Sequence, residues 1–125
     1  MALSYTGRLF RRIVVSSGYT FGNSRRVSYV GLMVKFNEYS SRDEFVYRRG
    51  ADGKWHCSCR PEDDNEFRFW EAIRWLEKNG YIKVSWRETV RVSRLLDGSD
   101  SFIKLTEKGL AAAPSYLKQK EDFPA

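Results

Sequence analysis

The hydrophobic pattern is clearest over residues 66–79, where it predicts a helix with one apolar side. Four residues recur at the three- and four-residue spacing that brings side chains onto one helical face: Phe69, Ala72, Ile73 and Leu76. The polar and acidic residues of 62–65 supply candidates for the N-terminal cap, where the helix dipole favours negative charge. Asn79 and Gly80 predict the end of the helix, because glycine tolerates the left-handed conformation that often closes one.

A period of two replaces the helical period over residues 83–95. Apolar side chains occupy even positions and polar or basic ones occupy odd positions, which predicts a half-buried strand with a basic outward face. Glu88 interrupts the apolar series and predicts a bulge or a bend, since strands rarely exceed about 10 residues. A polar turn at 97–100 then allows an antiparallel return over 101–106, with apolar residues directed to the core.

The first forty residues contain two apolar segments, and each fits both periods. In residues 1–17, apolar side chains recur at helical spacing from Tyr5 to Ile13, whereas the β-branched run at 13–15 favours a strand. In residues 24–39, the valines fit a helix or an alternating strand, and their β-branched side chains again favour the strand. We therefore predict a strand in each segment.

A β-hairpin is predicted over residues 44–59. Two segments rich in aromatic and β-branched residues flank a turn at 50–53 that contains two glycines. After Gly109, residues 110–119 predict a short last helix in spite of a proline. We expect residues 119–125 to form a frayed tail.

Two phrases of the sequence carry a family resemblance: WLEKNGYI at 75–82 and KLTEKGLAA at 104–112. Together with the order of helix and hairpin, they resemble the C-terminal half of a winged helix-turn-helix domain. The resemblance implies that residues 66–79 are the third, recognition helix and that the hairpin after them is the wing. That family places two helices just before the recognition helix, where this sequence predicts a hairpin. Either the N-terminal half is a β-rich elaboration, or the likeness is local and the fold is another α+β arrangement.

The expected architecture is one α+β domain over residues 1–125. It comprises a basic, β-rich part over 1–60, a winged-helix-like part over 61–118 and the tail. A hydrophobic content of 42% with 15% aromatic residues is ample for a core. No long apolar run or signal-peptide pattern is present, and Cys57 and Cys59 do not make a disulfide framework. We expect a cytoplasmic protein without a membrane segment.

The distribution of charge along the chain limits the classes of binding partner. Residues 1–60 hold 11 basic and 4 acidic side chains, whereas residues 61–125 hold 11 basic and 12 acidic ones. A basic half is typical of proteins that bind nucleic acid or an acidic protein surface. Residues 61–80 carry 3 basic and 6 acidic side chains, which would repel phosphates. Any contact with DNA should therefore come from the wing and from the basic N-terminal half.

Metal binding and catalysis have little support in the sequence. His56 alternates with Cys57 and Cys59 on a predicted strand, so the imidazole faces away from the thiols, and no second ligand pair exists. The chain has one histidine, which lies beside both thiols in sequence, so no separated catalytic triad can be assembled. A glycine-rich phosphate loop is also missing. We expect neither an enzyme nor a cofactor.

The basic residues give the stronger signal. Odd positions of the predicted wing strand, together with pairs such as Arg11-Arg12, Arg25-Arg26 and Arg48-Arg49, can contact phosphates in a salt-sensitive way. The predicted contact residues are Lys83, Arg87, Arg91, Arg25, Arg26 and Lys104. The sequence thus favours a non-catalytic protein that binds double-stranded DNA. The alternative is a non-catalytic protein-binding module, such as a small phage or mobile-element protein that docks on a host factor.

Overall fold

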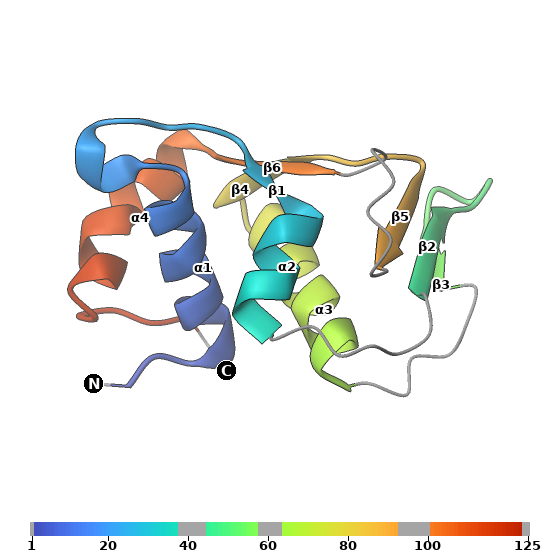
Figure 1. Ribbon diagram of the computed structural model, residues 1–125, viewed down its shortest axis with the longest axis horizontal. Helices are drawn as coiled ribbons and strands as arrows, with labels where there is room; N and C mark the ends of the chain where they lie inside the picture. Colours follow the sequence, from blue (N-terminus) through green and yellow to red (C-terminus); the bar gives the residue numbers. More distant parts are fainter. Residues whose placement is uncertain (1, 38–44, 58–63, 93–100, 124–125) are drawn as a thin grey trace.

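The computed structural model describes residues 2–37, 45–57, 64–92 and 101–123. In chain order the elements are α1 (Tyr5–Ser16), the 3-10 helix η1 (Tyr19–Phe21), β1 (Val27–Ser28), α2 (Tyr29–Asn37), β2 (Phe45–Arg49), β3 (Trp55–Cys57), α3 (Asp64–Lys78), β4 (Ile82–Ser85), β5 (Thr89–Val92), β6 (Phe102–Leu105) and α4 (Glu107–Leu117). The prediction of an α+β fold is confirmed. The four α-helices lie on one side of the sheet formed by β1, β6 and β4, and the other strands lie beyond α3 (Figure 1).

The described residues form two three-stranded antiparallel sheets, with strand orders β1-β6-β4 and β3-β2-β5. The predicted single strand over 83–95 is wrong, because β4 pairs with β6 whereas β5 pairs with β2. The predicted bend at Glu88 is confirmed, since the strand is interrupted between Ser85 and Thr89. The predicted turn at 97–100 lies outside the described residues.

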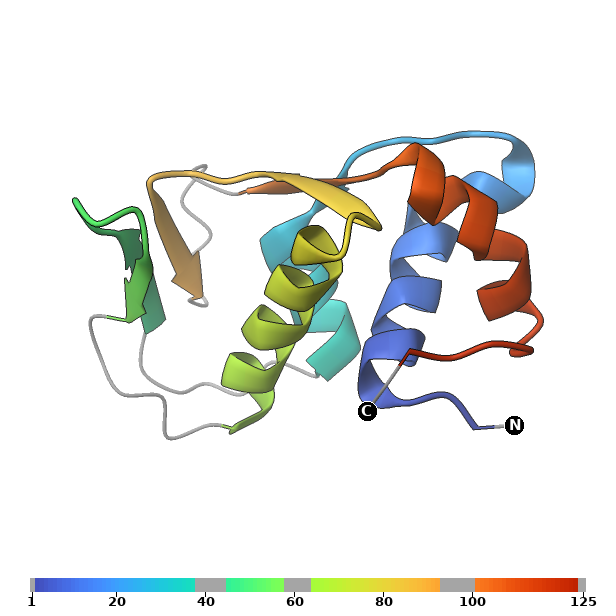
Figure 2. The ribbon, with the colours of Figure 1, turned by 180° about the vertical axis from the view of Figure 1, so that it is seen from behind.

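The core fills the space between the helices and the inner face of the first sheet. The predicted apolar stripe of α3 is confirmed, since all four of its residues are buried, and β6 contributes the buried Ile103 and Leu105. Seen from behind, α3 lies directly below β4 (Figure 2). The second sheet is joined to α3 by Tyr47, whose ring stacks on Trp70 with centroids 4.5 Å apart.

The strand predicted in residues 1–17 is wrong, because this segment forms α1. Ser4 caps the helix by accepting a hydrogen bond from the N–H of Gly7. One face of α1 is buried completely and includes Leu9, Phe10 and Ile13. The gain from burying that face outweighs the strand preference of the β-branched residues at 13–15, which is worth only about 1 kcal/mol.

The strand predicted in residues 24–39 is also largely wrong. Of the described residues 24–37, only Val27 and Ser28 are in a strand, and α2 follows at once because the Ser28 hydroxyl accepts a hydrogen bond from the N–H of Gly31. The expected β-rich N-terminal part is therefore wrong for residues 5–37. It holds for the predicted hairpin, since β2 and β3 pair with Tyr47 opposite Cys57.

The end of the chain is fixed against its beginning, so the expectation of a frayed tail is wrong for Asp122 and Phe123. The Asp122 carboxylate accepts hydrogen bonds from the backbone N–H of Ser4 at 2.7 Å and from the Ser4 hydroxyl at 2.8 Å. Phe123 is only 5% exposed and packs on Phe10, Trp75, Tyr81 and Tyr116. These contacts join the tail to the cap of α1.

We expect Asp122→Asn to lower the free energy of unfolding by about 1 kcal/mol near neutral pH. Desolvation opposes ionisation of Asp122, but the hydrogen bonds from Ser4 and from the N–H of Phe123 together lower its pKa below the usual value. A lowered pKa gives stability that is present above the normal aspartate pKa of 3.8 and is lost as the pH falls through the folded pKa. Urea unfolding of both proteins should converge near about pH 2, and a constant difference down to that pH would contradict the assignment.

Candidate nucleic-acid interface

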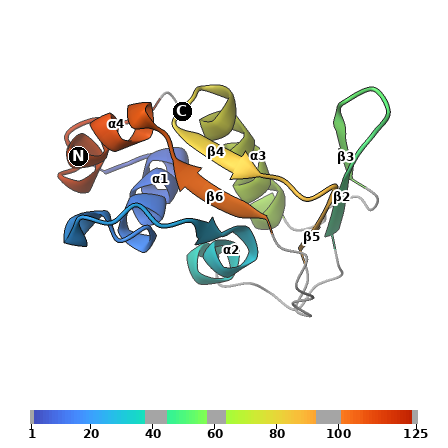
Figure 3. The ribbon, with the colours of Figure 1, turned by 90° about the horizontal axis from the view of Figure 1, so that it is seen from above.

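The outer face of the β1-β6-β4 sheet carries an opposed pair of lysines. Val84, Ile103 and Leu105 point into the core, so the side chains of Lys83 and Lys104 project to the other face and are exposed. The register pairs Lys83 directly with Lys104. Figure 3 looks onto this sheet from the side opposite the helices.

Arg26, the residue just before β1, adds a third cation. Its guanidinium lies 4.1 Å from the centroid of the Phe102 ring, a cation–π contact that holds the side chain over the sheet. Because Val27 pairs with Ile103, the residue before it lies beside Lys104. Neighbouring strands are about 4.8 Å apart, so the cations of β4, of β6 and of the residue before β1 span a width of about 10 Å. We call Arg26, Lys104 and Lys83 the cationic row.

The cationic row does not stabilise the fold by itself. Like charges on directly opposed positions of a sheet destabilise it, and a negatively charged partner would offset the repulsion between the lysines. The other described residues of this face, Ser28, Ser85 and Phe102, carry no negative charge. The arrangement is therefore suited to a bound anion, such as a phosphate, on the outer face.

The remaining predicted contact residues do not join the row. Arg91 is in β5, opposite Val46 in the second sheet, so the expectation that one strand carries Lys83 and Arg91 on a shared face is wrong. Arg87 is exposed just after β4, and its backbone N–H donates to the Ser101 hydroxyl at 3.0 Å. Arg25 lies apart from the row, with its guanidinium against Gly18 at the end of α1.

Helix α3 offers fewer cations than its sequence suggests. The Arg68 guanidinium lies 4.2 Å from the centroid of the Tyr5 ring, and Arg74 forms an ion pair with Glu77 at 3.4 Å. Glu71 is exposed on the same helix. Two of its three basic residues thus make contacts within the protein, so α3 is less suited than the sheet to phosphate contacts.

The structure adds Phe102 to the residues named from the sequence. Alternation over residues 102–105 already places its ring on the face of Lys104, and that pattern could have identified it. The strand register, which the sequence does not specify, is what brings Arg26 and Lys83 to either side of Lys104.

The single histidine, His56, lies in β3, and its side chain faces Asp52 in the turn of the β2-β3 hairpin. Its Nε2 is 3.2 Å from each carboxylate oxygen of Asp52, and both side chains are exposed. The backbone N–H of Lys54, followed by His56, lowers the pKa of Asp52. Across the described ranges, no three His, Cys, Asp or Glu side chains gather as a metal site.

In the part of the chain that the structure covers, no helix has both the length and the apolar character that a membrane crossing requires. Asp64–Lys78 is the longest of the α-helices in that part, and charged residues interrupt it throughout. Comparison with protein-family models, curated proteins and solved structures finds no significant match to this chain.

Proposed function

We propose that this chain is a small, non-catalytic, winged-helix-like protein that binds double-stranded DNA through its sheet. The observation that carries the proposal is the cationic row, in which Lys83 faces Lys104 directly and Arg26 lies alongside. The wing strand of the family resemblance is β4, and its return strand is β6. The bound group would be the phosphate backbone, and the cellular setting would be the cytoplasm.

The order of the elements supports the winged-helix-like part of the proposal. Two helices, α1 and α2, precede α3, and an antiparallel pair of strands follows it. The hairpin of β2 and β3 is inserted between α2 and α3, and it pairs with β5 rather than with the first sheet. The apparent mismatch between hairpin and helices in the sequence then comes from this insertion.

The chemistry of the row favours the DNA backbone over the base edges. Lysine ammonium groups are flexible point charges, and they contact phosphates without the planar geometry that base recognition requires. Each neutralised phosphate releases counterions and changes the logarithmic salt dependence by about 0.9. Three contacts therefore predict binding that weakens steeply as salt rises and that depends little on sequence.

Replacing both Lys83 and Lys104 by glutamine tests the proposal. We expect binding to a random-sequence duplex to weaken about tenfold at low salt, and the salt slope to fall by about 2, because two phosphate contacts are lost. Fluorescence anisotropy across a salt series measures both quantities. The free energy of unfolding should not fall, since the change removes a like-charge pair.

The matched control replaces Lys118 and Lys120 by glutamine. Both are exposed beyond the end of α4, and the change in net charge is the same. If the two double variants lose equal affinity, the protein responds to net charge alone and the sheet is not the site. A wild-type protein that ignores DNA at physiological salt would instead favour the protein-binding alternative.

A further inference from the structure

A groove of about 770 Å³ runs beside α1, on a different surface from the cationic row. Its walls include three guanidinium side chains and three apolar ones: Arg8, Arg11, Arg12, Leu3, Val15 and Phe36. None of the residues that line the groove belongs to β1, β4 or β6, and in Figure 1 the start of α1 and the end of α2 lie away from that sheet. A ligand of this groove therefore need not compete with one bound to the sheet.

The arginines of the groove form a cationic wall. Arg8 and Arg12 are exposed and four residues apart, which places them about 6 Å apart along the helix axis. α1 contains no acidic residue, and like charges at this spacing destabilise a helix. Arg11 makes a long hydrogen bond from Nε to the carbonyl of Leu117 at 3.5 Å, and Arg8 lies 5.8 Å from the Tyr5 ring centroid. Within the described ranges, none of the three arginines has a carboxylate partner.

The rest of the groove is apolar, which a phosphate backbone does not require. Val15 is 39% exposed, and Phe36 is partly buried at the end of α2, where its ring packs edge-on against Tyr5. A ligand that covers these side chains gains binding free energy, because apolar surface is removed from water. The groove thus matches a ligand with anionic groups along one side and apolar groups beside them.

We propose that this groove docks an acidic amphipathic helix of a partner protein. Carboxylates four residues apart on such a helix have the spacing of Arg8 and Arg12, and the adjoining apolar stripe covers Val15 and Phe36. Charge complementarity accelerates the encounter, and apolar burial supplies affinity. A nucleic acid has the charge for the arginines but lacks the apolar stripe.

A fluorescent helical peptide with glutamate at every fourth position and leucine along the adjoining stripe is the probe. We expect it to bind the full chain, and we expect Arg8→Gln with Arg12→Gln to weaken binding about tenfold, or one unit of log Kd. Val15→Ser should also weaken it by removing apolar contact. The matched control is Arg48→Gln with Arg49→Gln, which removes the same charge from exposed positions of β2 and should leave binding unchanged.

The proposal would be overturned if the peptide did not bind, or if a peptide with glutamine in place of glutamate bound equally well. It would also be overturned if both arginine double variants lost the same affinity for the peptide. A fourth contradicting result is that random-sequence duplex DNA displaces the peptide completely by binding in the groove. The last would assign the groove to nucleic acid. Lys83→Gln with Lys104→Gln should leave peptide binding intact. The experiments therefore test the groove as a peptide-docking site separately from the sheet as a DNA-binding site.

Discussion

Gly109→Ala is expected to lower the free energy of unfolding by about 3 kcal/mol, although the same exchange usually stabilises a helix. A Cβ at Gly109 would overlap the carbonyl oxygen of Tyr81, which is a backbone atom and cannot rotate away. Forcing extra volume into a packed site costs about 1–3 kcal/mol, and more where the backbone itself must move. Urea unfolding at neutral pH measures the loss.

Ala111→Gly is the control for this prediction. Ala111 is exposed in the same helix, so its replacement should cost only the ordinary glycine penalty of about 0.5–1 kcal/mol. Gly109→Ala would gain that amount if the site were open. A stabilised Gly109→Ala variant would show that α4 does not approach the segment after α3 as closely as described.

This close approach explains why the two phrases of the family resemblance occur together. The N–H of Thr106 donates to the carbonyl of Tyr81 at 3.2 Å, and its hydroxyl donates to the carbonyl of Gly80. The ammonium of Lys108 donates to the carbonyl of Asn79 at 2.7 Å and lies 4.4 Å from the Tyr81 ring centroid. Residues 79–81 of the first phrase and 106–109 of the second therefore form a joint between α3 and α4.

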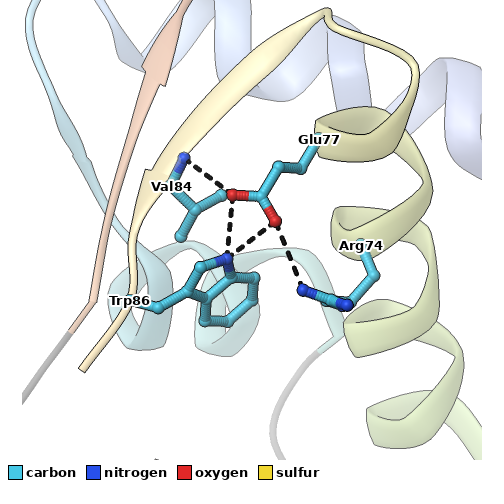
Figure 4. A network of polar contacts seen from close by, with 4 residues as sticks. All are labelled: Arg74, Glu77, Val84 and Trp86. Carbon is cyan, nitrogen blue, oxygen red and sulfur yellow. Dashed lines mark hydrogen bonds and ion pairs between the residues drawn. The ribbon is translucent and has the colours of Figure 1, made fainter. Parts of the chain in front are cut away.

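Glu77→Ala is expected to lower the free energy of unfolding by about 2–3 kcal/mol. The Glu77 carboxylate accepts the indole N–H of Trp86 at 2.8 and 2.9 Å and the backbone N–H of Val84 at 3.3 Å (Figure 4). Hydrogen bonds to a charged group contribute about 1.5–3 kcal/mol, and partial exposure reduces that value here. A negative charge in the last turn of a helix is otherwise unfavourable, so its contacts with the strand account for its place.

Glu77→Gln is the matched control for the network. The amide keeps one oxygen acceptor for the Trp86 indole but loses the charge and the ion pair with Arg74, so we expect a loss of about 1 kcal/mol. Trp86 fluorescence should also change in Glu77→Ala, because the indole N–H gains access to water. Equal stability of the alanine variant and the wild type would show that this carboxylate does not hold β4 to α3.

The elements predicted correctly are those in which local pattern and tertiary burial agree. The stripe of α3 and the apolar residues of β6 are examples, since each places one face toward the core. The segments that form α1 and α2 carry helical spacing together with strand-favouring valines, and the balance is decided by their caps and by packing against α3. A sequence alone does not show what such a segment will pack against.

The candidate interface could be predicted in composition but not in geometry. Charge and alternation indicate Lys83, Lys104 and Arg26 as contact residues, yet only the pairing of β1 and β4 with β6 places them in one row. Arg91 shows the converse, because the bend near Glu88 carries it into another sheet although the alternation continues. In both cases the position of the side chain depends on which strand, distant in sequence, its own strand pairs with.

The proposed function requires that duplex DNA contact the cationic row. The most direct test records backbone amide resonances of isotope-labelled protein during titration with a short random-sequence duplex at low salt. The largest shifts should occur at Arg26, Lys83, Phe102 and Lys104, and should diminish as salt is raised. Shifts confined to α1 or α3, or none at all, would contradict the claim.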